Sequence, residues 1–177
     1  SLSILVLCSL QTFRQSSCGF YLMIMSIFNL IRLALSTVFV ILSLSFAIDY
    51  SVSIFFFCQV RNFIVTTCNM GSVTCLCMAV IDQYLTTCSR PGWRHWSNIT
   101  MAYRLTALTT LIWVLNGIPY VIFFDSISPT NRAICAAVNP IFLQYHTYGY
   151  FVIYNNILPL ITTIFGVMAF RNVRYLT

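Results

Sequence analysis

The stretch of sequence that decides the fold is 55-FFFCQVRNFIVTTCNMGSVTCLCMAVIDQYL-85. It consists almost entirely of apolar and small residues, and its only charged side chains, Arg61 and Asp82, lie near its two ends. A helix needs about 20 mostly apolar residues to cross a bilayer. It also satisfies its own backbone hydrogen bonds, which lipid cannot do. The stretch therefore predicts a transmembrane helix from Phe55 to Leu85.

The rest of the chain repeats this pattern. Full apolar spans are predicted at Phe20–Phe46, Leu105–Phe124 and Tyr148–Phe170, and a partial one ends near Gln11. Of the 177 residues, 59% are hydrophobic and only 7% are charged, whereas a soluble domain carries about 25% charged residues. Barrel strands would be shorter and would alternate apolar with polar residues. We therefore predict a single all-α transmembrane domain over residues 1–177, with one partial and four full helices.

The arginines predict the orientation, because cytoplasmic loops are enriched in basic residues. One side of the membrane receives most of them: Arg14, Arg90, Arg94, Arg104, Arg171 and Arg174. The other side receives only Arg61 and Arg132, so the first side is predicted to be cytoplasmic. The glycosylation sequon Asn98-Ile99-Thr100 then lies in the cytosol and is interpreted as a chance match.

Several functional classes are not favoured. No arginine cluster with interleaved polar surface is present to follow a nucleic-acid backbone. Cys75 and Cys77 form a Cys-x-Cys pair, but no further His or Cys group completes a metal site. No pair of ionisable groups is expected at one membrane depth, so we predict no enzyme, no metal and no cofactor.

Two landmarks of the Phe55–Leu85 span carry a family resemblance. Cys58 opens it, and Asp82-Gln83-Tyr84 closes it 24 residues later, a rise of roughly 36 Å. Other positions fit the same pattern: Ser72, Leu76, Trp113, Pro119, Cys135 and Pro159. In this order and spacing the chain resembles the rhodopsin-like (class A) G-protein-coupled receptors. The resemblance runs from the end of the family's first helix to the inner end of its fifth. It implies a partial seven-helix receptor bundle, truncated before helices six and seven.

The resemblance also implies roles for individual residues. Cys58 and Cys135 are expected to form an extracytoplasmic disulfide, and Val73 to contact the helix-distorting Pro159. Asn29 matches the acidic position of the family's sodium site, where a neutral amide would weaken sodium binding. Outer-half positions imply a ligand pocket that includes Asn69, Tyr154, Asn155 and Asn156.

Two positions depart from the family pattern. Gln83 stands where the family has the arginine that pairs with the acid, and Val167 stands where it often has a tyrosine. We expect Asp82 to pair instead with Arg90 or Arg94, or to be an interfacial acid solvated by water and headgroups. These departures put G-protein coupling, or its regulation, in question.

Arg32 is a charge inside an apolar span. Such a charge is costly and normally faces the bundle interior or a water-filled cavity. We expect Arg32 to line the ligand pocket and attract an anionic or carbonyl-rich group, or else to pair with a residue of the missing helices. His95 and His146 are predicted to be loop residues, and Asn139-Pro140 a loop turn.

The leading functional prediction is a receptor in the plasma membrane that passes the binding of an extracellular ligand to a heterotrimeric G protein. The ligand stays open among amines, peptides and chemosensory molecules. A transporter or channel fragment is one alternative, although it would predict repeats or several intramembrane charges. A non-signalling, decayed receptor is another.

Overall fold

The computed structural model describes residues 16–45, 51–88, 97–127, 134–137 and 139–176. Three long helices come first: α3 (Ser17–Ser45), α4 (Ser51–Thr87) and α6 (Ile99–Phe123). A hairpin of β1 (Phe124–Ile127) and β2 (Ile134–Ala137) follows. The chain ends in α7 (Pro140–Val152), the π-helical η1 (Ile153–Ile157) and α8 (Leu158–Leu176). The predicted helical fold is confirmed for α3, α4, α6 and the α7–η1–α8 segment. The expected partial helix ending near Gln11 lies outside the described residues.

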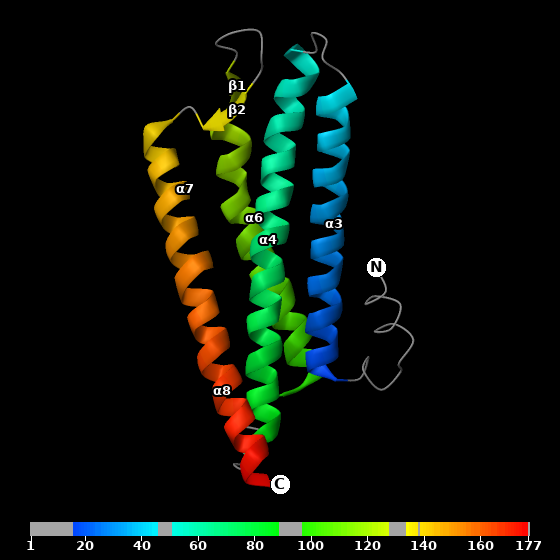
Figure 1. The fold of residues 1–177 in the computed structure, drawn as a ribbon, viewed down its shortest axis with the longest axis vertical. Helices are drawn as coiled ribbons and strands as arrows, with labels where there is room; N and C mark the ends of the chain where they lie inside the picture. The colour runs from blue at the N-terminus through cyan, green and yellow to red at the C-terminus, as the bar shows by residue number, and fades with distance from the viewer. Residues whose placement is uncertain (1–15, 46–50, 89–96, 128–133, 138, 177) are drawn as a thin grey trace.

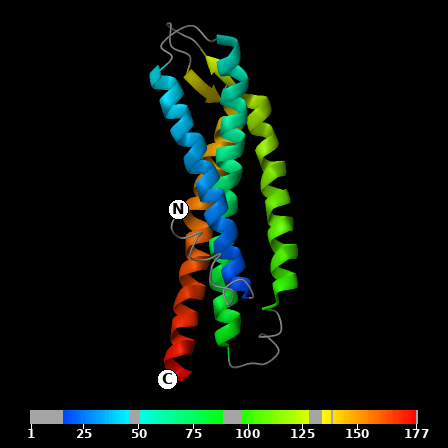
Figure 2. The same ribbon diagram turned by 90° about the vertical axis from the view of Figure 1, so that its right-hand side faces the viewer.

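The helices lie side by side in an elongated bundle (Figures 1 and 2). Helix α4 occupies its middle and packs against α3, α6 and α8. Its buried side chains are mostly small: Cys68, Cys75, Cys77 and Ala79, together with Met70. Small side chains allow neighbouring helices to approach closely without a large apolar core. The central position of α4 explains why residues along it contact three other helices.

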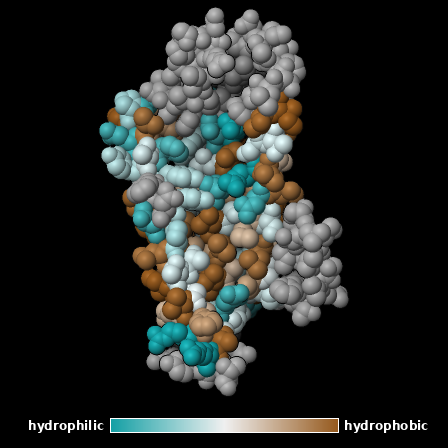
Figure 3. Space-filling model, viewed as in Figure 1, coloured by the Kyte–Doolittle hydropathy of each residue, from teal (hydrophilic) through white to brown (hydrophobic). Residues whose placement is uncertain are grey.

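Within the described ranges, three helices are long and apolar enough to cross a membrane, over Ser17–Val38, Gln59–Thr87 and Ile99–Phe123. Many of their large apolar side chains point away from the bundle. Leu33 is 64% exposed, Leu111 56% and Ile122 65%. Figure 3 shows hydrophobic side chains mainly over the middle of one face, and hydrophilic ones towards the hairpin and at the opposite end. Lipid is the natural solvent for such a surface, because apolar area exposed to water is unfavourable.

The hairpin at one end of the bundle was not predicted. Strands β1 and β2 pair antiparallel, with Phe124 opposite Ala137 and Ser126 opposite Cys135. The expectation of helices alone is therefore corrected for these residues. Each strand has only four residues, and β1 follows α6 directly along the chain. A period-two pattern is not recognisable over so short a segment. We call this end of the bundle the hairpin end, and the opposite end the Asp82 end.

Helix α7 begins at Pro140, well before the predicted start at Tyr148. Asn139 caps it: the side-chain oxygen accepts from the backbone N–H groups of Ile141 and Phe142 at 2.9 and 3.4 Å. Proline suits the first helical position because its missing N–H would have no intrahelical partner there. The interpretation of Asn139-Pro140 as a loop turn is therefore wrong, since the pair starts a helix.

Candidate functional site

Arg32 contacts Asn69 across the interface of α3 and α4. Its Nη1 donates to Asn69 Oδ1 at 3.3 Å. The Tyr154 hydroxyl donates to the same oxygen at 3.3 Å, and Asn69 Nδ2 donates to the Tyr150 hydroxyl. The structure thus brings together Arg32, Asn69 and Tyr154, three of the predicted pocket residues, and adds Tyr150. We call these four residues the polar cluster.

A second polar contact lies one helical turn closer to the Asp82 end. Ser72 Oγ donates to Asn29 Oδ1 at 3.0 Å. Residues three apart share a face of a helix, so Asn29 and Arg32 on α3 face Ser72 and Asn69 on α4. The two helices run antiparallel, which pairs the residues in reverse order. The predicted sodium-site position is therefore occupied by a neutral amide bonded to a hydroxyl.

Aromatic rings extend the polar cluster towards the hairpin end. The rings of Tyr150 and Tyr154 stack, with centroids 4.9 Å apart. The ring of His146 lies 5.5 Å from that of Tyr150, and His146 Nδ1 shares a hydrogen bond with the Tyr120 hydroxyl at 2.6 Å. The prediction that His146 is a loop residue is wrong, because α7 begins earlier than expected and places this side chain between helices.

A small cavity of about 60 Å³ lies beside these rings, between α4, α6 and α7. Its polar lining includes Thr67, Asn116, Tyr145, His146 and Tyr150. Tyr145 donates to Asn116 Oδ1 at 2.6 Å. This volume holds one or two water molecules, since a water occupies about 30 Å³. The cavity adds polar surface next to the cluster but is too small for a ligand of drug size.

Helix α6 is fixed to α4 by Trp113, one of the positions on which the family resemblance rests. Trp113 Nε1 donates to Thr74 Oγ1 at 3.0 Å. One turn away, Gly117 allows close approach: a Cβ there would lie 2.6 Å from the Phe63 ring and 2.8 Å from Thr67 Oγ1. Only glycine fits this contact without a shift of its neighbours.

The π turn η1 lies immediately before Pro159. It closes with a hydrogen bond from the Leu158 N–H to the Ile153 carbonyl. The thiol of Cys77 forms hydrogen bonds beside this turn. Its sulfur lies 3.4 Å from the Leu158 carbonyl oxygen and 2.9 Å from Thr162 Oγ1. The expected contact between Val73 and Pro159 stays a prediction. Leu76, another position that fits the family pattern, is exposed on the surface of α4.

Asp82 joins three segments at its end of the bundle. Its carboxylate accepts from Ser97 Oγ at 2.7 Å and from the backbone N–H of Cys18 at the start of α3. Although Asp82 is buried, its charge is therefore stabilised by two donors and by the first turn of α3, where anions are favoured. The expected partners Arg90 and Arg94 lie outside the described residues.

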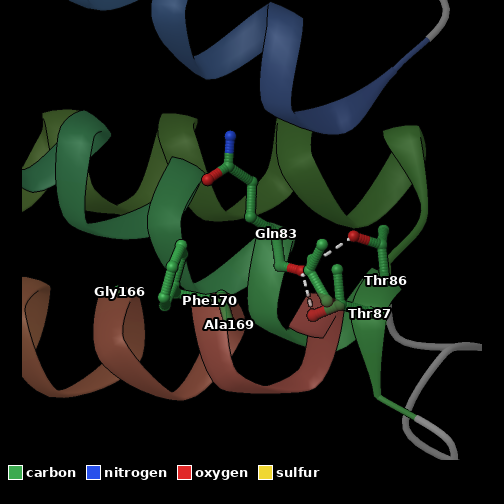
Figure 4. Close-up of a pocket in the computed structure, with 7 residues that line it drawn as sticks. Gln83, Thr86, Thr87, Gly166, Ala169 and Phe170 are labelled. Carbon is green, nitrogen blue, oxygen red and sulfur yellow. Dashed lines mark hydrogen bonds between the residues drawn. The ribbon is translucent and has the colours of Figure 1, made fainter. Parts of the chain in front are cut away.

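Gln83 does not bond to Asp82. Its Nε2 donates to Cys18 Sγ at 3.5 Å, and Figure 4 shows the side chain pointing towards α3. Its backbone carbonyl accepts from Thr86 and Thr87, each at 2.9 Å. Tyr84 makes an edge contact with Phe165 of α8, with ring centroids 5.4 Å apart.

A larger pocket of about 300 Å³ opens beside Gln83, between α4 and α8. Figure 4 shows its lining residues, which are Gln83, Thr86, Thr87, Gly166, Ala169, Phe170 and Val173. None of these side chains carries a charge. The pocket lies at the opposite end of α4 from the hairpin.

The side chains of three predicted site residues lie outside the described part of the structure; these are Cys58, Cys135 and Asn155. The backbone nevertheless puts Cys135 in β2, which pairs with β1, and β1 packs against α4, the helix that contains Cys58. The disulfide stays a prediction.

Sequence reasoning missed Tyr150, His146 and Ser97. Tyr150 had a recognisable signal, because it precedes Tyr154 by one helical turn and so shares its face. His146 required the correct start of α7. Ser97 had no signal, since its contact joins residues 15 apart across a chain reversal.

Comparison with known proteins adds no assignment: no family model matches the sequence, and no curated protein matches it closely.

Proposed function

We propose that this chain is part of a ligand-activated receptor of the rhodopsin-like type. It crosses the plasma membrane several times and passes the binding of an extracellular ligand to a heterotrimeric G protein. The polar cluster carries this proposal, because α3, α4 and the α7–η1 segment each contribute polar side chains to one place. Polar and charged groups inside apolar helices are costly and mark functional sites by default.

The depth of the cluster supports the proposal. Arg32 is 15 residues from the start of α3, and Asn69 is 18 residues from the start of α4. At 1.5 Å per residue these positions lie roughly 22 and 27 Å from the helix ends. Within the candidate spans, Arg32 lies six residues before Val38 and Asn69 ten residues after Gln59, so both would lie inside a bilayer core of about 30 Å. A ligand that enters from the hairpin end reaches such a site between the helices.

The pocket at the Asp82 end supports the transmitting role. A receptor shifts between two conformations when a ligand prefers one of them, and movement of packed helices then opens or closes the opposite end. The pocket between α4 and α8 lies where an intracellular partner would bind in the predicted orientation. Asp82 fixes the start of α3 and the segment before α6 at the same end, so its contacts bias the choice of conformation.

Nucleotide exchange tests this function. The protein in lipid nanodiscs is mixed with each class of Gα subunit with βγ, and a peptide and small-molecule library is screened for accelerated exchange. Asn69→Leu removes the centre of the polar cluster, and Leu33→Ala is the matched control on the exposed face of α3.

We expect a ligand that accelerates exchange for the wild type and the control but at least tenfold less for Asn69→Leu at equal folded protein. Exchange that no library member changes, or an equal response from Asn69→Leu, would contradict the proposal.

A further inference from the structure

We propose that the polar cluster binds a carboxylate, with the Arg32 guanidinium as its charged contact. This inference rests on the proposed function in one respect: it takes the cluster to be the site that the ligand occupies. Three observations carry it: the donors that the cluster leaves over, the position of the chain's own acids, and the stacked tyrosines beside Arg32.

The acceptor oxygens of Asn69 and Tyr150 already receive hydrogen bonds within the polar cluster, whereas some of the N–H and O–H donors are left for a ligand. Asn69 Oδ1 already accepts from Arg32 and from Tyr154. The Tyr150 oxygen accepts from Asn69, so its own O–H proton points elsewhere. Arginine has five N–H donors and no acceptor, and among the described residues Arg32 donates one hydrogen bond. Arg32 is also exposed. A ligand that meets this surface meets donors, and the complementary group is an acceptor with negative charge.

Among the carboxylates that the structure describes, none lies at the depth of Arg32. The sequence contains three acids, Asp49, Asp82 and Asp125. Asp82 follows Asn69 by 13 residues on the same helix, roughly 20 Å away, and it is bound to Ser97 and Cys18. Asp125 belongs to β1 at the hairpin end, and Asp49 lies outside the described residues. An arginine in an apolar environment needs an opposite charge.

Among the anions that a guanidinium binds through two hydrogen bonds, a singly charged carboxylate costs less to bury in an apolar bundle than a doubly charged phosphate does. The guanidinium fork binds a planar carboxylate through two parallel hydrogen bonds. Next to it, the rings of Tyr150 and Tyr154 stack with an interplanar angle of 21°. Both side chains are half-buried, so they offer some aromatic surface to an apolar ligand body. The class is therefore an aryl or acyl carboxylate. It has two possible sources, a water-soluble ligand or a fatty acid that is dissolved in the bilayer.

Ligand-dependent thermal stabilisation tests carboxylate binding to the polar cluster without a G protein. Anything that binds only the folded state raises its melting temperature. The melting temperature of the protein in nanodiscs is measured against increasing benzoate and, separately, oleate. Benzamide and oleamide are the matched neutral probes. Arg32→Gln removes the charge, Arg32→Lys keeps the charge without the fork, and Leu33→Ala is the control. Circular dichroism and gel filtration confirm that each variant is folded. If Arg32→Gln does not fold, Arg32→Lys is the variant compared with the wild type.

We expect benzoate or oleate to stabilise the wild type and Leu33→Ala more than its amide does. Arg32→Gln should bind at least tenfold more weakly, about 1.4 kcal/mol, and Arg32→Lys should lie between the two. A response to benzoate identifies a water-soluble source, and a response to oleate alone identifies a membrane source. No stabilisation by either acid, equal stabilisation by the amides, or an unchanged response in the Arg32 variant would overturn the inference. Carboxylate binding without nucleotide exchange would instead refute the receptor function and leave this site intact.

Discussion

Ser72 donates a hydrogen bond to Asn29 at 3.0 Å, one turn from the contact between Arg32 and Asn69 at 3.3 Å. The two contacts form consecutive links between antiparallel helices. Together the two contacts use residues three apart on α3 and three apart on α4, so one helix register produces both. The register therefore fixes the polar cluster and the neutral amide beside it at the same time.

Asn29→Asp should create sodium-dependent stability. A carboxylate next to the Ser72 hydroxyl supplies the charged oxygen that a hard cation requires, whereas the amide of Asn29 supplies only a neutral one. The melting temperature is measured in sodium chloride and in choline chloride at equal ionic strength. We expect no difference for the wild type and a higher value in sodium for Asn29→Asp. Equal values for the variant in both salts would contradict this account of the site.

Tyr150→Phe should weaken the contact between α4 and α7. The change removes the acceptor for Asn69 Nδ2, and hydrogen bonds between membrane helices contribute on average about 0.6 kcal/mol and at most about 1.7. Tyr148→Phe is the matched control, because Tyr148 is 69% exposed. Thermal unfolding in nanodiscs should show a lower melting temperature for Tyr150→Phe alone. An equal decrease in melting temperature for both variants would show that the polar cluster does not hold α7 against α4.

Gly117→Ala should separate α4 from α6. The added methyl group would meet Phe63 at 2.6 Å and Thr67 Oγ1 at 2.8 Å, and overpacking of this kind costs about 1–3 kcal/mol. Gly149→Ala is the control, since the nearest atom to its new methyl group lies at 3.9 Å. The free energy of unfolding should fall for Gly117→Ala and stay within about 0.5 kcal/mol for Gly149→Ala. A tolerated Gly117→Ala would show that this close approach is absent.

Ser97→Ala should loosen the Asp82 end. It removes a hydrogen bond of 2.7 Å to a carboxylate, and such charged bonds contribute about 1.5–3 kcal/mol. Thr100→Ala, in the next turn, is the control. Hydrogen exchange at the start of α6 should be faster for Ser97→Ala than for the wild type or the control. Unchanged exchange would mean that Asp82 does not fix this segment.

Much of the bundle could be predicted from the sequence, because lipid leaves the backbone few choices. A continuous apolar run such as Phe55–Leu85 must be helical in a bilayer, and α4 contains the whole of it. The ends were less predictable. Gln144 and His146 interrupt the apolar run that continues into α8, so the start of α7 at Pro140 was missed although its cap and proline were visible.

The site was predictable where one helix face carries polar residues at helical spacing. Arg32 stood out as a charge among apolar residues, and Asn69 and Tyr154 followed from the family resemblance. Contacts between distant segments were not predictable, as the bond between Asp82 and Ser97 illustrates. A single sequence contains no signal for such a pair, because it depends on where a chain reversal returns.

The most direct test of the account is the location of the two ends of α4. One epitope tag is inserted between β1 and β2 and, in a separately expressed copy of the protein, another between α4 and α6; antibody binding is measured on intact and on permeabilised cells. The account predicts that the hairpin tag is stained on intact cells and that the α4–α6 tag is stained only after permeabilisation. Staining of both tags in the same compartment, or in the reverse order, would contradict it.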